Sequence, residues 1–333
     1  MPQAIYRHSR RQALRLGAIA AAVLASRPAV VSAQAAWPAK PVRIMISFPP
    51  GGSSDIIARA LSPHLSEMFG QQFIVDNKPG AGGTVAADAL KREPPDGYAF
   101  LLSNNAPFTF APTVFKKIPY DPVKDFTHFA YLGTAFGGLV AHPKAGIKDV
   151  AGLIAKAKAE PGRLTYGSSG VGSIGHITGS SFCRLTGIDM VHIPYRGAAP
   201  LRVDLTSGVV DMAFEGLDSR LPEIVAGTMV GIASISDKRL PKAPNIPTLR
   251  ELGFDLVSGN WHGLTGPANL PASIAEKLHA GLAQICTREI VLRQFDAIGN
   301  LYEPRSRADF AAFVESQLAV WRPQIIAAGV TEQ

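Results

Sequence analysis

The chain has 333 residues, of which 47% are apolar and 18% charged, and its formal net charge is +7. The first 35 residues hold five arginines and no acid, so without them the count of Lys and Arg falls from 33 to 28 against 26 Asp and Glu, a net charge of +2. This balance removes the main support for a nucleic-acid or acidic-membrane partner. The remaining chain of roughly 300 residues is long enough for two lobes.

The first 35 residues are typical of an export signal. Arginines between positions 7 and 15 precede an apolar stretch at 16–25, and small residues follow, which predicts cleavage after Ala35 or Ala33. The apolar stretch is too short to span a bilayer. Because two arginines stand side by side in "SRRQALR", both a twin-arginine signal and an ordinary Sec signal are open.

Cysteine is scarce, with Cys183 and Cys286 alone in the chain. Both lie in apolar helical patterns, which predicts two separate buried thiols. An exported chain of this size can rely on its core and needs no disulfide framework.

Short β-like runs alternate with helical periods through the middle of the chain, which predicts an α/β architecture with largely parallel sheets. The predicted strands are 42–48, 73–77, 98–104, 164–169, 190–195, 210–215 and 230–236. The predicted helices are 55–69, 84–91, 149–159, 173–186 and 198–207.

The C-terminal segments 271–295 and 306–329 are predicted to be helical without strands. Pro271 suits a first helical turn, and Ser306 with Asp309 approximates a capping box.

Four junctions run from a strand through glycine into a helix: 47–61, 77–90, 167–182 and 194–205. Glycine lets the backbone turn with its N–H groups outward, and each helix start leaves free donors and a partial positive charge. Serines at 53, 54, 168, 169 and 173 add hydroxyls. These features favour an anion held by uncharged donors. The alternative is that glycine and serine merely close turns and cap helices.

The junctions "FPPGGSSDIIARAL", "DNKPGAGGTVAADAL", "LTYGSSGVGSIGHITG" and "HIPYRGAAPLRVDLTSGVVDMAFE", with "APNIPTLRELGF" after them, resemble the successive signature segments of the tripartite tricarboxylate transporter substrate-binding proteins, the Bug family. The match follows the whole mature chain in order. The resemblance implies a two-lobed periplasmic binding protein of type II, the Venus-flytrap kind, with two crossover strands. Lobe 1 would be 37–139 plus 258–333, and lobe 2 would be 140–257, which makes a disulfide between the two cysteines improbable.

The resemblance also implies that a carboxylate is held in the cleft by backbone N–H groups, hydroxyls and waters. The implied ligand-binding residues are Phe48, Gly51, Gly52, Ser53, Ser54, Asp55, Gly82, Gly83, Ser168, Ser169, Gly172, Ser173, His176, Tyr195, Arg196, Gly197 and Glu215. Arg196 stands where the family often has lysine and Glu215 where aspartate is frequent, so the identity of the ligand stays open.

Several of these residues have a second interpretation. Asp55 suits the N-terminal charge of a helix, and Glu215 could either accept a hydroxyl or amine of the ligand or lie in an ion pair at the rim. His176 could face the cleft or pack within its helix. Phe108 and Trp261 could form apolar cleft walls or belong to the core.

We therefore predict a periplasmic solute receptor that delivers a small organic carboxylate to the membrane subunits of a tripartite transporter. It is expected to be a monomer without cofactor, metal or nucleic acid. A sensor that feeds a membrane kinase is the alternative. An enzyme is less favoured, because no G-x-S-x-G elbow, P-loop or H-E-x-x-H spacing occurs.

Overall fold

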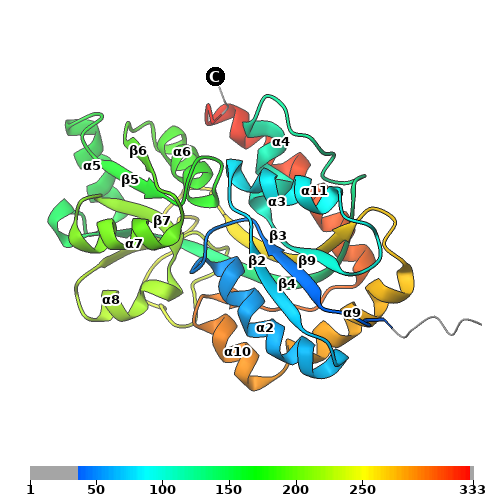
Figure 1. The fold of residues 1–333 in the computed structure, drawn as a ribbon. Coiled ribbons are helices and arrows are strands. Elements are labelled where there is room, and N and C mark those ends of the chain that lie inside the picture. Colours follow the sequence, from blue (N-terminus) through cyan, green and yellow to red (C-terminus); the bar gives the residue numbers. More distant parts are fainter. Residues whose placement is uncertain (1–36, 331–333) are drawn as a thin grey trace, which may run out of the picture. The chain divides into compact units, whose positions relative to one another are not determined.

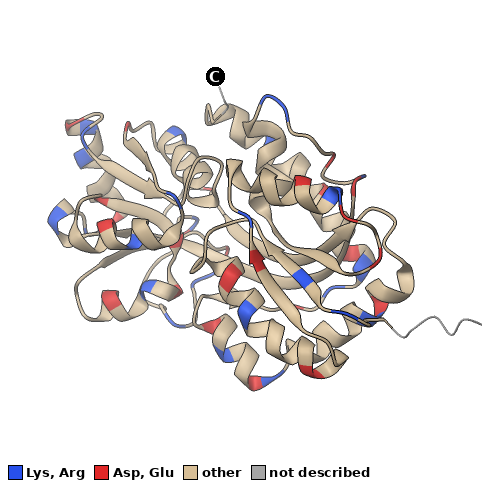
Figure 2. Cartoon of the chain, viewed as in Figure 1, with Lys and Arg blue, Asp and Glu red and all other residues tan. Residues whose placement is uncertain are grey.

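The computed structural model describes residues 37–330, which alternate between strands and helices as Figure 1 shows. The predicted signal peptide lies outside the described residues. Within them, no helix combines the length and apolar character that a bilayer crossing requires. Lysine and arginine are interspersed with aspartate and glutamate over the elements in view (Figure 2).

The strands are β1 (Val42–Ile46), β2 (Phe73–Asn77), β3 (Ala99–Asn104), β4 (Phe126–Ala141), β5 (Thr165–Ser168), β6 (Val191–Pro194), β7 (Met212–Gly216), β8 (Val230–Ser234), β9 (Gly259–Pro267) and β10 (Asn300–Leu301). The α-helices are α2 (Ser53–Phe69), α3 (Thr84–Lys91), α4 (Ala111–Val114), α5 (Val150–Ala159), α6 (Ile174–Thr186), α7 (Ala198–Ser207), α8 (Leu221–Val225), α9 (Ala272–Ile285), α10 (Glu289–Asp296) and α11 (Arg307–Ala327). Short 3-10 turns at Ala81–Gly83, Pro143–Ala145 and Asp218–Arg220 and a π-helix at Ala106–Phe110 complete the described elements.

One long strand, β4, joins two halves of the sheet, whose order is β2-β1-β3-β9-β4-β7-β5-β6. Residues up to Phe136 pair with β9, whereas Gly137–Ala141 pair with β7 and β8. The first half contains β1, β2, β3, β9 and β10, and the second contains β5, β6, β7 and β8. The chain returns from the second half at Ser258–Gly259, where Ser258 N–H still bonds the carbonyl of Ile235.

The sheet is mixed, so the prediction of largely parallel pairing is only half right. β1 pairs in parallel with β2 and β3, and β5 with β6 and β7. β9 runs antiparallel to both β3 and β4. The sequences of β4 and β9 do not predict strands clearly, because each contains several glycines and glycine has a low strand propensity.

The core of the first half follows from alternation along β1. Ile44 and Ile46 point to one face, where they pack with Leu61 of α2 and Leu278 of α9. Met45 points to the other face and joins the cluster that contains α3 and α11. The second half repeats this arrangement, since Leu139 and Val140 of β4 belong to clusters on opposite faces.

A separate apolar cluster joins the end of α11 to α6 and to the turn at α4. Trp321 and Ile325 of α11 pack with Ile177 of α6 and with Phe110. Because α6 belongs to the second half, this cluster links the two halves away from β4.

Two predictions about the C-terminal region need correction. It contains a two-residue strand, β10, which pairs with Thr134 and Ala135 of β4. The segment 271–295 is helical as predicted and consists of two helices, α9 and α10, but Pro271 lies just before the first helix and not in its first turn. Ser306 caps α11 as predicted, accepting a bond from the N–H of Asp309. Both cysteines are free, with Cys286 buried and Cys183 half-buried.

Candidate functional site

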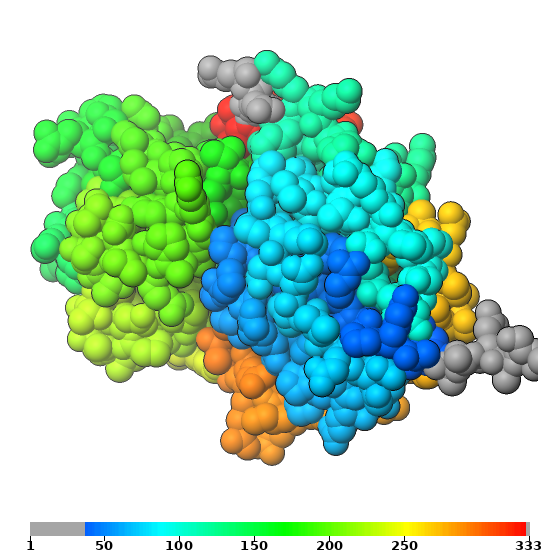
Figure 3. Space-filling model, in the orientation of Figure 1, coloured from blue at the N-terminus to red at the C-terminus, as the bar shows by residue number. Residues whose placement is uncertain are grey.

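A cavity of about 180 Å³ is lined by residues from both halves of the sheet. This volume lies below the ~300–1,000 Å³ of pockets for drug-sized ligands, so it suits a small molecule. Figure 3 shows the atoms of the second half, in green, meeting the blue and cyan atoms of the first half along one seam.

Eight of the residues predicted from sequence line this cavity, and nine do not. Those that line it are Phe48, Gly51, Gly52, Ser53, Ser54, Ser169, Ser173 and Glu215. Those that lie outside its lining are Asp55, Gly82, Gly83, Ser168, Gly172, His176, Tyr195, Arg196 and Gly197.

The first cavity junction connects β1 to α2. Gly51 has φ +87°, a left-handed conformation that glycine adopts without strain. Asp55 then accepts a bond from Gly51 N–H (3.0 Å), from Arg59 Nε and from Asn77 Nδ2 (3.1 Å). Its carboxylate therefore stabilises the turn without lining the cavity. Burial raises the pKa of Asp55, but the hydrogen bonds from Arg59, Gly51 and Asn77 together have the larger effect, so the pKa is lowered.

The free donors of this junction face the cavity. Gly52 caps α2 without a side-chain bond, and the N–H groups of Ser53 and Ser54 bond no acceptor among residues 37–330. A helix N-terminus with free N–H groups favours an anion.

Ser53 belongs to a hydrogen-bonded chain in the cavity wall. Asn300 donates through Nδ2 to the carbonyl of Leu132 (2.8 Å), so its Oδ1 accepts from Nδ1 of His262 (3.1 Å). The other ring nitrogen, Nε2, is therefore an acceptor, and it lies 3.0 Å from Ser53 Oγ. Burial lowers the pKa of His262 to about 4, which keeps the ring neutral.

The second cavity junction connects β5 to α6. Ser173 caps the helix by accepting a bond from the N–H of His176 (3.4 Å), and both Ser173 and Ser169 line the cavity. Ser168 does not reach it, because its hydroxyl lies 2.7 Å from Nε2 of His192.

His176 packs behind this junction instead of facing the cavity. Its ring stacks on His192 with centroids 3.9 Å apart, and its Nδ1 accepts a bond from the N–H of Gly172. Burial lowers the pKa of His176 to about 4, and burial with the neighbouring ring lowers that of His192 to about 3. Both rings are neutral at pH 7.

The Ser168–His192 pair brings a hydroxyl and an imidazole together, which the sequence did not reveal because β5–β6 pairing makes the contact. Ser168 is 1% exposed and lies outside the cavity lining. No acidic side chain among the described residues bonds His192. The pair therefore stabilises the junction and offers no nucleophile to a ligand.

The other two junctions form the seam between the halves. A Cβ on Gly197 would lie 3.1 Å from Pro49 of the first half, and one on Gly82 would lie 3.6 Å from the carbonyl of Val171 in the second. Tyr195 bonds Asp204 (2.8 Å) within its own half. These glycines allow the halves to approach closely.

Glu215 is accompanied by charged residues that sequence reasoning missed. Arg220, 1% exposed, donates through Nε to Glu215 and through Nη1 to Glu223 (3.3 Å). Burial opposes the charge of Arg220, but the bonds to Glu215 and Glu223 dominate and raise its pKa. Arg220 and Arg202 also line the cavity, as does Asn104. An arginine five residues after Glu215 was the available signal.

Phe108 and Trp261 belong to the core, where both are at most 1% exposed, and neither lines the cavity. Their interpretation as cleft walls is therefore wrong. Within residues 37–330, no group of three or more His, Cys, Asp or Glu is placed to hold a metal ion.

A strand shared by two α/β halves, with a lined cavity between them, is the architecture of two-lobed solute-binding proteins. A structure described as the periplasmic binding protein BugD shares it at TM-score 0.83 and 27% identity, covering 89% of this chain and 100% of that one. R. palustris Rpa4515 with adipate matches at TM-score 0.83 and 30% identity, covering 88% and 98%. MatC from Rhodopseudomonas palustris with bound malate matches at TM-score 0.82 and 27% identity, covering 87% and 100%.

Residues 57–330 match the family model described as "Tripartite tricarboxylate transporter family receptor". Protein BugT of Bordetella pertussis is 32% identical over 287 residues, which covers 86% of this chain and 88% of BugT. The chain therefore belongs to this receptor family, as its signature segments predicted, and it has the two-lobed fold that the resemblance implied.

Proposed function

We propose that this protein is a periplasmic receptor that binds a small organic carboxylate and passes it to the membrane subunits of a tripartite transporter. One observation carries the proposal: free backbone and hydroxyl donors from both halves line a single small cavity. Each hydrogen bond to a charged group contributes ~1.5–3 kcal/mol, so four or five of them can support micromolar binding, which requires about 8 kcal/mol. Adipate and malate in two related structures agree with this ligand class.

We propose lobes of 37–139 plus 258–333 and of 140–257, which close as hinged bodies around the ligand. The pairing of β4 changes at Phe136–Gly137, close to the first limit, and the return segment at Ser258–Gly259 coincides with the second. A ligand that contacts both lobes stabilises the closed arrangement without any covalent step.

A thermal-shift screen of the mature protein against mono- and dicarboxylates tests the binding. A ligand at 100 times its dissociation constant adds about 2.7 kcal/mol to the free energy of unfolding, so at least one acid is expected to raise the Tm clearly. The Ser54→Ala/Ser173→Ala double variant should lose this shift while folding normally. Absence of a shift with every acid at millimolar concentration contradicts the proposal.

Delivery and location need their own tests. Spheroplasts that carry the membrane subunits should take up labelled ligand when purified protein is added and not without it. N-terminal sequencing of the periplasmic fraction is expected to begin near Ala36, and light scattering is expected to show a monomer. Uptake that is independent of added protein contradicts the transport role.

A further inference from the structure

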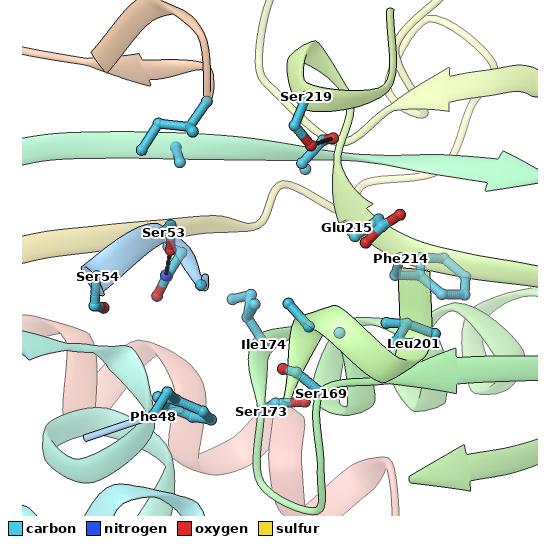
Figure 4. A pocket seen from close by; sticks show the side chains of 18 of the residues that line it. Phe48, Ser53, Ser54, Ser169, Ser173, Ile174, Leu201, Phe214, Glu215 and Ser219 are labelled. Carbon is cyan, nitrogen blue, oxygen red and sulfur yellow. Dashed lines mark hydrogen bonds between the residues drawn. The ribbon is translucent and has the colours of Figure 1, made fainter. Parts of the chain in front are cut away.

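The hydroxyls of the cavity differ in whether they offer a proton or a lone pair to a ligand. A backbone N–H can only donate and a carbonyl can only accept, so a bond to either fixes the direction at the side chain. Figure 4 places Ser54 and Ser173 apart from Glu215 and Ser219, with Ile174 between Ser54 and Glu215 in this view.

The hydroxyls of Ser54 and Ser173 can each donate a hydrogen bond to the ligand. The N–H of Ala106 donates to Oδ1 of Asn104 (3.0 Å), so the amide nitrogen of Asn104 must face Ser54 and donates to its oxygen (3.1 Å). Ser173 accepts from the N–H of His176. Both oxygens accept a bond, and neither hydroxyl donates to another of residues 37–330, so both O–H groups can donate to a ligand. We call these two hydroxyls the donor pole.

Glu215 and Ser219 have the opposite character. Ser219 donates its proton to the carbonyl of Gly216 (2.7 Å), which leaves only oxygen lone pairs for the cavity. Oε1 of Glu215 accepts a bond from Arg220, whereas Oε2 accepts none from residues 37–330. We call Glu215 and Ser219 the acceptor pole.

The charges at the acceptor pole also favour a ligand group that donates hydrogen bonds. The buried guanidinium of Arg220 is shared by Glu215 and Glu223, so the three side chains together carry one net negative charge. A second ligand carboxylate would meet a like charge and lone pairs there, whereas an ammonium or hydroxyl would find acceptors. Leu201, Phe214 and Ile235 also line the cavity and suit an aliphatic body.

We infer that the ligand joins one carboxylate to a hydrogen-bond donor, a protonated amine or a hydroxyl, at its far end, and that Glu215 selects this group. The inference rests on the proposed function and narrows its ligand class. The competing arrangement is a dicarboxylate whose second carboxylate is held by Arg202, an exposed cation that lines the same cavity.

Calorimetry at pH 7 with two matched series tests the inference: ε-aminocaproate, ε-hydroxycaproate, adipate and caproate, and γ-aminobutyrate, γ-hydroxybutyrate, succinate and butyrate. In at least one series, the amino or hydroxy acid is expected to bind about tenfold or more tightly than both the diacid and the simple acid, as one bond to a charged group implies. Glu215→Gln should remove most of this preference, and Ser219→Ala should reduce it.

Glu223→Gln is the matched control, because it removes the other carboxylate that Arg220 bonds and lies outside the cavity lining. It should unfold at a temperature similar to Glu215→Gln and keep most of the preference for the amino or hydroxy acid, because the Glu215 carboxylate still lines the cavity although the net charge of the three side chains falls to zero. If a diacid binds most tightly and Arg202→Ala abolishes that binding, the inference is wrong and the proposed function stands. If no acid of either series binds in calorimetry or in the wider thermal-shift screen, the proposed function itself fails.

Discussion

The four junctions all run from a strand through glycine into a helix, yet the glycine turns of two line the cavity and those of the other two lie at the seam between the halves. The junctions at 51–54 and 169–173 present free donors, and each is stabilised by polar side chains outside the cavity lining, the buried Asp55 in one and the half-buried histidine pair in the other. The junctions at 82–83 and 195–197 place glycine where the opposite half approaches. The two junctions whose turns line the cavity also carry the serines, and the two at the seam carry none, so composition and position in the fold agree.

The largest expected effect concerns the support of the first cavity junction. Asp55→Asn removes the charge of a carboxylate, 4% exposed, that bonds Gly51, Arg59 and Asn77. We expect the free energy of unfolding to fall by about 2–3 kcal/mol and ligand affinity to fall with it. Urea denaturation and calorimetry measure both, and Arg59→Gln, which alters only the more exposed partner, should have a smaller effect on each.

The second effect compares the two donor hydroxyls. Ser54→Ala and Ser173→Ala should each weaken carboxylate binding about tenfold or more, because each removes a bond to a charged group. Ser168→Ala is the control, since Ser168 bonds His192 outside the cavity. It should change stability and leave affinity nearly unchanged. Equal affinities for all three variants and the unmodified protein would refute the division into cavity and supporting serines.

The third effect concerns the seam. Gly197 has φ +110° and lies against Pro49, so Gly197→Ala combines backbone strain with a tight contact between the halves. We expect weaker binding through a slower closing step, measured by stopped-flow fluorescence, with little change at the cavity. Arg196→Ala, one residue away, should alter affinity less than twofold, because Arg196 does not line the cavity. A larger loss of affinity would show that Arg196 contacts the ligand.

A fourth effect, on stability alone, is the pH dependence of the second cavity junction. The pKa values of His176 and His192 lie near 4 and 3 in the folded chain, below the ordinary value of 6.5. Above pH 6.5 both rings are neutral in both states, and below it the unfolded chain takes up protons that the folded chain does not. The free energy of unfolding should therefore fall from pH 6.5 towards pH 4.

Urea denaturation at several pH values measures this slope. His128 and His262 are also buried with pKa values of about 4, so the protein as a whole should show the same trend. His192→Phe should lower the slope by about one proton, because it removes one titrating ring. An unchanged slope would show that His192 is protonated in the folded state.

The sequence predicted the regular elements well where local pattern decides them. β2, α3 and α7 have the bounds that their apolar periodicity indicated, and the donor-rich turn at 51–54 lines the cavity. β4 and β9 were not predicted from local pattern because their glycines weaken it, although the family resemblance implied two crossover strands between the lobes 37–139 plus 258–333 and 140–257.

Contacts made over long sequence distances could not be predicted in this way. Ser168 meets His192 only because β5 pairs with β6, and Asn104 reaches Ser54 only because β3 lies beside β1. Arg220 stands close to Glu215 in sequence, but its burial between two carboxylates depends on the turn that follows β7. The direction of each hydroxyl bond, which separates the donor pole from the acceptor pole, comes from these contacts alone.

The most direct test of the whole account is a crystal structure of the mature protein with the tightest acid from the calorimetric series. The account predicts carboxylate oxygens within hydrogen-bonding distance of the Ser54 and Ser173 hydroxyls and of the backbone N–H groups at the start of α2. A carboxylate held instead by the guanidinium of Arg202 or Arg220, with both hydroxyls unbonded, would contradict the claim that uncharged donors capture the anion.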